Sequence, residues 1–221
     1  MGISKEIAEL VGMHIGDGTL YKTNWGLVWE LRGDIKEKEY YIFHVAPLVN
    51  GICGITLTPK LRSGGKNGCF GVQTSKKEVT QLFLGLGFKP GPKTKTVKIP
   101  LYIKSANKKI KYSFLRGYFD TDGCLRFDKN RTKKYYYPRI EFCSASFELI
   151  DELSVMLNGL GFRNYVWGSI NDKKLCIAGE NMLEKWMKFI GTKNTKHLNK
   201  YLEFQKYGFV SMPRWHNPVL R

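Results

Sequence analysis

Hydrophobic residues recur at helical spacing in some stretches of the chain and alternate with polar residues in others. In the first part, this pattern predicts helices at about 4–17, 36–50 and 76–86, with strands within 18–33 and 54–74. In the remainder it predicts a helix over 107–122, strands within 124–143, a helix over 146–159, strands within 162–178, and helices over 180–190 and 195–206. Both parts follow one order, so the pattern indicates a duplicated α+β unit.

Two similar segments end the first helix of each part. Residues 10–18 read LVGMHIGDG and residues 115–123 read LRGYFDTDG, with the leucine, the first glycine and the final Asp-Gly in common. We therefore expect an N-terminal half over 1–88 and a C-terminal half over 107–206. A linker rich in proline and lysine over 89–106 joins them, and an extension follows over 207–221.

Small residues follow one stripe of each of these helices. Gly12 and Gly16 in the first, and Gly117 and Thr121 in the second, are spaced by four, so we expect the two helices to pack against each other closely. The glycines that come after the aspartates, at 18 and 123, suit the left-handed position that ends a helix. A capped helix end is the simplest interpretation of each Asp-Gly pair.

Chemistry is the alternative interpretation of Asp17 and Asp122. A carboxylate at a helix C-terminus faces the negative end of the helix dipole, which costs about 0.3–1 kcal/mol, and a bound cation reverses that cost. If the helices pack side by side, the two carboxylates meet, and their repulsion requires metal ions or protonation. Paired carboxylates with hydrated divalent metals are suited to phosphodiester hydrolysis.

The chain carries 36 Lys and Arg against 19 Asp and Glu, a formal charge of +17, spread over sequence that looks folded. This charge predicts a polyanionic partner, with a nucleic-acid-binding surface favoured over a disordered basic arm. Two predicted strand regions place polar, basic or aromatic residues on one face: Thr56, Thr58, Lys60 and Arg62, and Arg163, Tyr165, Trp167 and Ser169 opposite Val166 and Ile170. A plainly solvated sheet face produces the same alternation.

The two Asp-Gly segments resemble the motif that names the LAGLIDADG homing endonucleases, and the resemblance covers nearly the whole chain. It implies a single-chain protein of two pseudo-symmetric αββαββα halves with antiparallel, saddle-shaped sheets and the motif helices at the central interface. The implied function is that of an intron-encoded, monomeric endonuclease that cuts both strands of double-stranded DNA at a long, asymmetric target.

The resemblance also implies roles for single residues. Divalent metal, Mg²⁺ with Mn²⁺ as the alternative, would be held at Asp17, Asp122, Gly16 and Thr121, and the lysines that assist would be Lys93 and Lys196. Polar residues at strand ends would be Asp34 or Lys36 and Ser144, whereas Asp120 would be structural. We expect DNA contacts from a set of basic residues, for which a role on a solvated surface is an equally good explanation. These residues are Lys60, Arg62, Arg126, Arg131, Lys133, Lys134, Arg139 and Arg163.

Other functions remain open. An RNA-binding intron maturase or a DNA-binding regulator of the same fold would not cut, although the intact aspartates argue against a degenerate site. An unrelated RNA enzyme has no supporting motif. Five cysteines without a CxxC pair indicate buried, reduced thiols, and the absence of a signal or membrane-spanning segment predicts an intracellular protein without a membrane partner.

Overall fold

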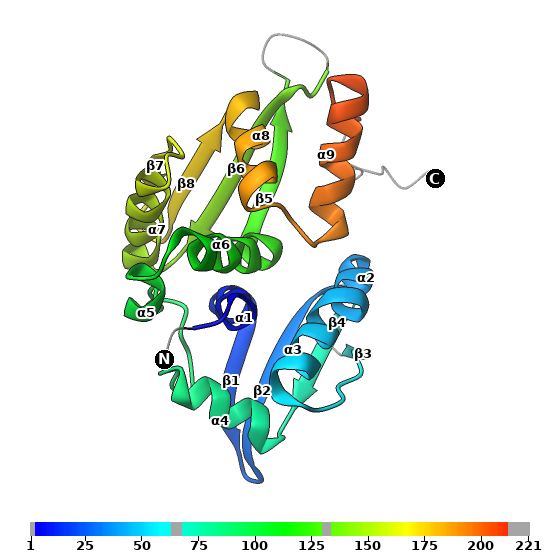
Figure 1. Ribbon diagram of the computed structural model, residues 1–221, viewed down its shortest axis with the longest axis vertical. Coiled ribbons are helices and arrows are strands. Elements are labelled where there is room, and N and C mark those ends of the chain that lie inside the picture. The colour runs from blue at the N-terminus through cyan, green and yellow to red at the C-terminus, as the bar shows by residue number, and fades with distance from the viewer. Residues whose placement is uncertain (1–2, 63–67, 130–133, 212–221) are drawn as a thin grey trace.

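The computed structural model describes residues 3–62, 68–129 and 134–211 (Figure 1). Arg131, Lys133 and residues 212–221 of the predicted extension lie outside the described residues. The first half consists of α1 (Lys5–Ile15), β1 (Gly18–Thr23), β2 (Gly26–Asp34), the 3-10 turn η1 (Ile35–Glu37), α2 (Lys38–Tyr40), the π-helical turn η2 (Tyr41–Val45), α3 (Ala46–Cys53), β3 (Lys60–Arg62), β4 (Cys69–Thr74) and α4 (Lys77–Gly85).

The short helix α5 (Leu101–Lys104) lies in the segment between the halves. The second half then consists of α6 (Lys108–Asp122), β5 (Gly123–Asp128), β6 (Tyr137–Ser144), α7 (Phe147–Gly159), β7 (Tyr165–Gly168), β8 (Lys173–Ala178), α8 (Glu180–Phe189) and α9 (Thr195–Tyr207). The helix predicted over 36–50 is present as one continuous helical run from 35 to 53, whose winding changes from 3-10 to α, then to π and back to α. The strand region predicted from 54 begins only at Lys60.

The two sheets have the same topology. The strand orders are β1-β2-β4-β3 and β5-β6-β8-β7, and every neighbouring pair is antiparallel. In Figure 1, α1 and α6 lie at the centre with one sheet extending from each, and the remaining helices flank the sheets. The predicted α+β class and its two-half layout are confirmed.

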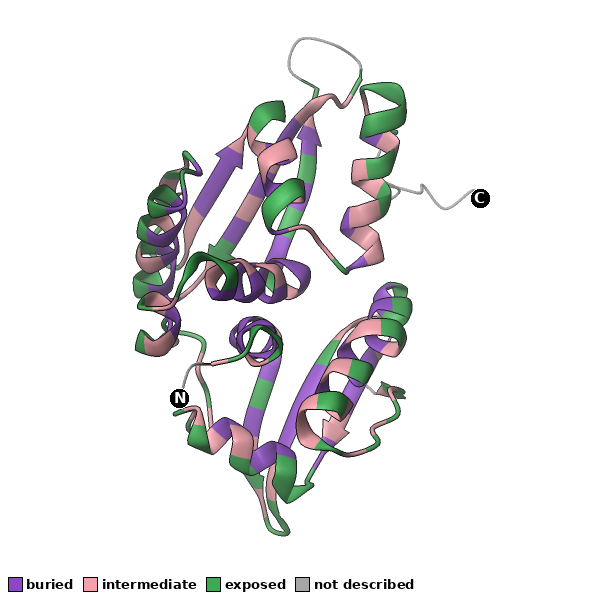
Figure 2. Ribbon diagram, in the orientation of Figure 1, coloured by how far each residue is buried: buried purple, intermediate pink, exposed green. Residues whose placement is uncertain are grey.

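There are two hydrophobic cores, one between the sheet and helices of each half, and that of the second half also includes Ala8, Val11 and Ile15 of α1. Trp29 in the first half and Trp186 in the second are the largest fully buried side chains. Strand β5 alternates between buried and exposed positions, and buried segments follow the strands in Figure 2. Because only one face of each sheet is covered by helices, the other face stays available to solvent or to a partner.

The close approach of α1 and α6 joins the two halves. A methyl group at Gly12 would lie 2.2 Å from the Phe114 carbonyl oxygen, and one at Gly117 would lie 2.0 Å from the Glu9 carbonyl oxygen. The buried carboxylate of Glu9 also accepts a hydrogen bond of 3.0 Å from the Arg116 guanidinium of α6. The packing predicted from the small residues is confirmed.

The conformation predicted for the glycines after the aspartates was wrong. Gly123 is extended, with φ −82° and ψ 161°, and Gly18 is not among the described glycines with positive φ. Instead, the first residue of β1 packs against the end of α1, and the first residue of β5 packs against the end of α6. A Cβ at Gly18 would lie 2.5 Å from the His14 Cα, and one at Gly123 would lie 2.3 Å from a Phe119 ring carbon.

The cysteines are free, as expected, but their burial was predicted only in part. Cys176 is buried, whereas Cys124 and Cys143 are exposed on the open face of the second sheet. Within the described ranges, no helix has the length and apolar character needed to cross a bilayer.

We expect Gly117→Ala to lower the free energy of unfolding by about 1–3 kcal/mol, because its methyl group would meet helix backbone, which cannot move aside as a side chain can. Gly51→Ala is the matched control, since it also lies within a helix but has open space around its Cβ position. The control should be neutral or stabilising by about 0.5–1 kcal/mol. Urea denaturation measures both, and equal stability of the two variants would contradict the packing argument.

Candidate functional site

Asp17 and Asp122 lie together at the same end of the helix pair. Asp17 lies two residues after the end of α1, and Asp122 is the last residue of α6. A Cβ at Gly16 would lie 2.2 Å from the Thr121 hydroxyl oxygen and 3.3 Å from the Asp122 Cβ, so the two motif ends are in contact. The packing of the helices thus brings together two carboxylates that are far apart in the sequence.

The surroundings of this pair favour the protonated form of each carboxyl. The pKa of Asp17 is raised to about 7, first by burial and then by the negative charges of Asp122 and Glu37, whereas Lys93 and Lys196 lower it. Burial among protein atoms also raises the pKa of Asp122, although its side chain keeps an exposed surface, and the same two lysines oppose the change. The pair therefore lacks positive charge, which a divalent cation would supply.

Lys93 lies at this end of α1. Its ammonium group donates hydrogen bonds to the carbonyl oxygens of Ile15 at 2.6 Å and Gly16 at 2.7 Å. Burial lowers the pKa of Lys93, while both aspartates raise it. Gly16 and Thr121 were both expected at the metal. The Gly16 carbonyl accepts a hydrogen bond from Lys93, and the Thr121 hydroxyl donates within its own helix to the Gly117 carbonyl at 3.1 Å.

Lys196, near the start of α9, reaches the site through a residue that the sequence did not single out. Its ammonium lies 2.8 Å from a carboxylate oxygen of Glu37, which belongs to the first half and is buried. The same oxygen accepts 2.7 Å from the amide of the fully buried Asn194. Glu37 therefore links the halves beside the two aspartates. One feature of the sequence indicated that Glu37 belongs to the site: it comes just after the second strand, next to the candidate strand-end residues Asp34 and Lys36.

Asp120 has the structural role that was expected of it. It is fully buried; its carboxylate accepts from the Thr192 hydroxyl and from the Lys193 backbone at 2.8 Å, while its carbonyl accepts from Asn194 at 2.8 Å. Burial raises the pKa of Asp120 to about 7. These bonds hold the turn before α9 in the position from which Lys196 reaches Glu37.

The other residues considered at strand ends act in local turns. The Asp34 carboxylate accepts 2.8 Å from the backbone of Lys36, where it caps η1, and the Ser144 hydroxyl accepts 3.0 Å from the backbone of Ser146. Neither bond points to a role at the two aspartates.

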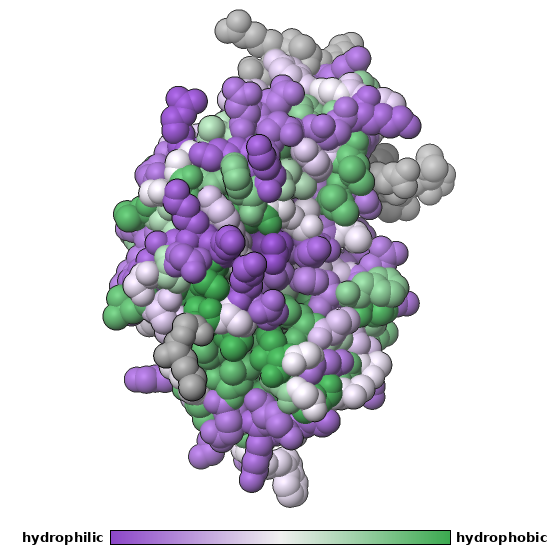
Figure 3. All heavy atoms as spheres, viewed as in Figure 1, coloured by the Kyte–Doolittle hydropathy of each residue, from purple (hydrophilic) through white to green (hydrophobic). Residues whose placement is uncertain are grey.

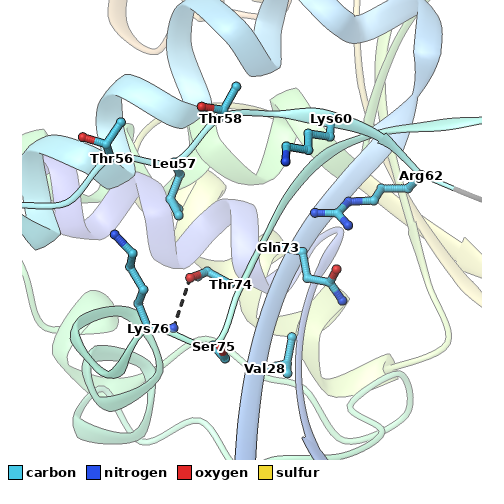
Figure 4. Close-up of a pocket in the computed structure, with 10 residues that line it drawn as sticks. All are labelled: Val28, Thr56, Leu57, Thr58, Lys60, Arg62, Gln73, Thr74, Ser75 and Lys76. Carbon is cyan, nitrogen blue, oxygen red and sulfur yellow. Dashed lines mark hydrogen bonds between the residues drawn. The ribbon is translucent and has the colours of Figure 1, made fainter.

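The open face of the first sheet forms a basic groove of about 640 Å³. Lys60, Arg62 and Lys76 line it together with hydroxyl and amide side chains, and Figure 4 shows Arg62 directed toward Gln73. Across the described ranges, none of the three cations forms an ion pair, and Nε of Arg62 is buried without a hydrogen-bond partner. Such a surface is suited to phosphate oxygens.

The open face of the second sheet carries arginines with acidic partners. Arg126 lies 2.9 Å from Asp128 and 3.3 Å from Glu141, and Arg139 lies 2.6 Å from Asp128. Tyr165 and Trp167 stack beside them at 5.3 Å between ring centroids, with Val166 packed toward the core, as the alternation predicted.

Three other predictions for this half have mixed outcomes. Ile170 was predicted to lie on the other face of the strand from Trp167, but it is 93% exposed at the β7–β8 turn. Arg163 is exposed but precedes β7, and Lys134 lies before β6 with its ammonium 4.5 Å from the Phe209 ring centroid. Neither basic residue lies on the sheet face itself.

The face seen in Figures 1 and 3 carries many of the helices and differs from the sheet surfaces. Hydrophilic and hydrophobic residues are mixed over it, and a hydrophobic patch lies below the middle of the view (Figure 3). A shallow hollow between α1 and α3, lined in part by Ile7, Leu48 and Ile52, is a separate apolar feature of the first half. The sheet faces are the stronger candidates for a polyanion.

The donor set at the two aspartates fits a hard divalent cation. No group of three or more His, Cys, Asp and Glu side chains suited to a metal occurs in the part of the chain that the structure describes. Mg²⁺ commonly binds one or two carboxylates and takes its other ligands from water and substrate phosphates. Asp17 and Asp122 match that arrangement, because they are adjacent, oxygen-bearing and short of positive charge.

Sequence comparison identifies a LAGLIDADG-like domain at residues 109–191. A probable translation initiation factor IF-2 of Thermococcus kodakarensis is 32% identical over 99 residues, which are 45% of this chain and 8% of that protein. An uncharacterized protein of Methanocaldococcus jannaschii is 27% identical over 182 residues, 80% of this chain and 19% of that protein. The chain thus spans less than a fifth of the length of these two curated relatives.

Solved structures of homing endonucleases have the same fold. The structure of I-DmoI in complex with DNA and Mn has a TM-score of 0.59 at 19% identity, covering 85% of this chain and 96% of that one. That of I-WcaI bound to its DNA recognition sequence has a TM-score of 0.61 at 15% identity, covering 92% and 87%. The predicted resemblance to the single-chain, two-motif LAGLIDADG homing endonucleases is confirmed.

In metal-free buffer, stability should depend on pH through Asp17. Because its pKa in the folded protein is about 7 against an ordinary value of 3.8, the folded state binds the proton more tightly than the unfolded state. Stability therefore falls as pH rises from about 4 to 7 and stays reduced above that range. We expect Asp17→Asn to raise the free energy of unfolding at pH 8 by roughly 1–3 kcal/mol, with little change at pH 4. Denaturation in EDTA measures this, and a variant no more stable than wild type at pH 8 would refute it.

Proposed function

We propose that this chain binds double-stranded DNA along both open sheet faces and hydrolyses both strands at one long, asymmetric site, using Mg²⁺ or Mn²⁺. The observation that carries the proposal is the pair of adjacent carboxyl groups of Asp17 and Asp122, each with a raised pKa, at the ends of two packed helices. The complexes of I-DmoI with DNA and Mn and of I-WcaI with its recognition sequence support it, as does the formal charge of +17.

Asp17 and Asp122 would hold the divalent metal, which supplies an activated water and stabilises the leaving oxygen when bound. Lys93 is anchored on the α1 carbonyls and Lys196 on Glu37, so each presents a fixed positive charge near the carboxylates. Fixed charges stabilise the negative charge that develops on a phosphate during hydrolysis without reorganising first. Because its pKa is lowered, Lys93 also gives up a proton to a leaving oxygen more readily than a free lysine does.

The two halves contribute unequal recognition surfaces to this function. The groove of the first sheet presents unpaired cations, and strands β5 and β6 of the second sheet present arginines paired with carboxylates. One chain with two different faces has no need of a palindromic target, which supports a monomer acting at an asymmetric site.

Asp17→Asn and Asp122→Asn should each reduce cutting about a hundredfold or more, because a metal bound at the pair contributes several kcal/mol to the transition state. DNA binding should be largely retained. Asp151→Asn is the control, since Asp151 is an exposed aspartate on α7 paired with Lys173. The assay incubates each protein with a randomised DNA library in magnesium or EDTA and sequences the new ends. Cutting that persists in the double mutant would disprove the metal pair, and specific binding without cutting by the wild type would favour a maturase or regulator.

DNA affinity should fall steeply with salt. If at least six phosphates contact basic side chains, the association constant should drop by roughly a thousandfold between 50 and 200 mM salt, as bound counterions are released. Titration of a fluorescent duplex at four salt concentrations measures the slope. An affinity independent of salt would mean that the positive charge is not used for DNA.

A further inference from the structure

Four charged side chains form a network on the open face of β5 and β6. Arg126 and Arg139 stand directly opposite each other in the strand register. Asp128 contacts both arginines, at 2.9 Å and 2.6 Å, and Glu141 contacts Arg126 at 3.3 Å. Arg139 also donates 2.9 Å to the hydroxyl of Tyr165 on the neighbouring part of the sheet. The network consists of two cations and two anions and carries no net charge.

Stability does not explain this arrangement. Two like charges directly opposite each other on a sheet are unfavourable. The pairs that offset them are open to water, with 53% of the Arg126 side chain and 31% of the Arg139 side chain exposed, and ion pairs of that kind contribute little to folding.

The pseudo-symmetry of the chain supplies an internal comparison. In the first sheet, Tyr21 pairs with Val28 at the register positions where Arg126 pairs with Arg139. Thr23 stands where the second sheet has Asp128, and of the four positions only Glu30 keeps its counterpart, Glu141. The same sheet topology therefore forms without the network, so the fold does not require it.

The contacts fix the directions of the guanidinium groups. The Nε of Arg139 lies 2.6 Å from Asp128 as an ion-pair contact without hydrogen-bond geometry, its NH1 group donates to Tyr165, and its NH2 group makes no hydrogen bond to another described residue. Arg126 uses one donor toward each carboxylate and keeps the others. Both terminal nitrogens of Arg126 are thus engaged, and each keeps one further hydrogen for a partner, as Nε keeps its own. A planar guanidinium that is held in place and still has donors left is suited to the two acceptors, O6 and N7, that guanine presents in the major groove.

We propose that Arg126 and Arg139 each read a guanine in the half-site bound by the second sheet, with Asp128 and Glu141 as the residues that position them. The proposal rests on the proposed function, since it assigns specificity within that DNA site. A network without net charge attracts phosphates weakly, whereas the unpaired cations in the groove of the first sheet attract them strongly. Because opposed side chains lie about 5 Å apart and base pairs about 3.4 Å, the two guanines should be neighbours or one step apart.

The test selects bound duplexes from a randomised library in EDTA, using the wild type, Arg126→Lys and Arg139→Lys. Lysine keeps the charge but lacks the planar fork. Lys174→Ala is the control, because Lys174 lies on the same sheet beside Trp167 and forms no ion pair with another described residue. We expect wild-type sites to contain two close guanines in one half. Each Arg→Lys variant should lose about tenfold or more of the preference at one of them, with an unchanged salt dependence. Lys174→Ala should keep both preferences.

Other outcomes separate this inference from the function on which it rests. Arg→Lys variants that keep the guanine preferences and bind all sequences more weakly would overturn the inference, because the arginines would then contact phosphates. Wild-type sites without guanines in either half would overturn it too, even if the protein cuts DNA. A wild type that binds no duplex at all would instead refute the proposed function. Thermal unfolding of each variant verifies that the fold is intact.

Discussion

The backbone contact between α1 and α6 is the constraint on which the rest of the structure depends. Gly12 and Gly117 allow each helix to touch the backbone of the other, which any larger side chain would prevent. Because the aspartates are fixed to the ends of these helices, the distance between the helices sets the distance between the carboxylates. It also sets how the two sheets lie relative to each other, so one contact controls both the chemistry and the surface that holds the substrate.

The contact between α1 and α6 also determines which charged groups surround Asp17 and Asp122. Burial at the helix ends raises the pKa of both carboxyl groups, the negative charge of Asp122 adds to the rise at Asp17, and Lys93 and Lys196 oppose it. Glu37 then holds Lys196 from the opposite half. The same residue adds negative charge near Asp17, so the protein tolerates an excess of acid at its centre that a cation would relieve.

The sequence predicted those features that leave a local or repeated trace. The two Asp-Gly segments revealed the duplication, and the spacing of Gly12, Gly16, Gly117 and Thr121 predicted the packed helices. Contacts that depend on tertiary placement left no such trace. Glu37 and Asn194 meet across the two halves, and Arg126 faces Arg139 only because of the β5–β6 register. The prediction of a left-handed conformation at Gly18 and Gly123 was wrong. Glycine is required at both positions because a Cβ there would clash with the preceding helix, and not because of the backbone conformation.

The position of Lys93 makes the connecting segment part of the site. This residue belongs to neither duplicated unit, yet its ammonium closes the end of α1, and the nearby Gly91 is bonded to Leu20 of β1 at 2.8 Å. Further along, Ile99 is bonded to Glu152 of α7 at 2.7 Å. An engineer who exchanged halves between such proteins, or expressed them as separate polypeptides, would therefore have to keep residues through Lys93 with the first half. A neutral, flexible spacer in their place would join the halves but leave the centre without one of its cations.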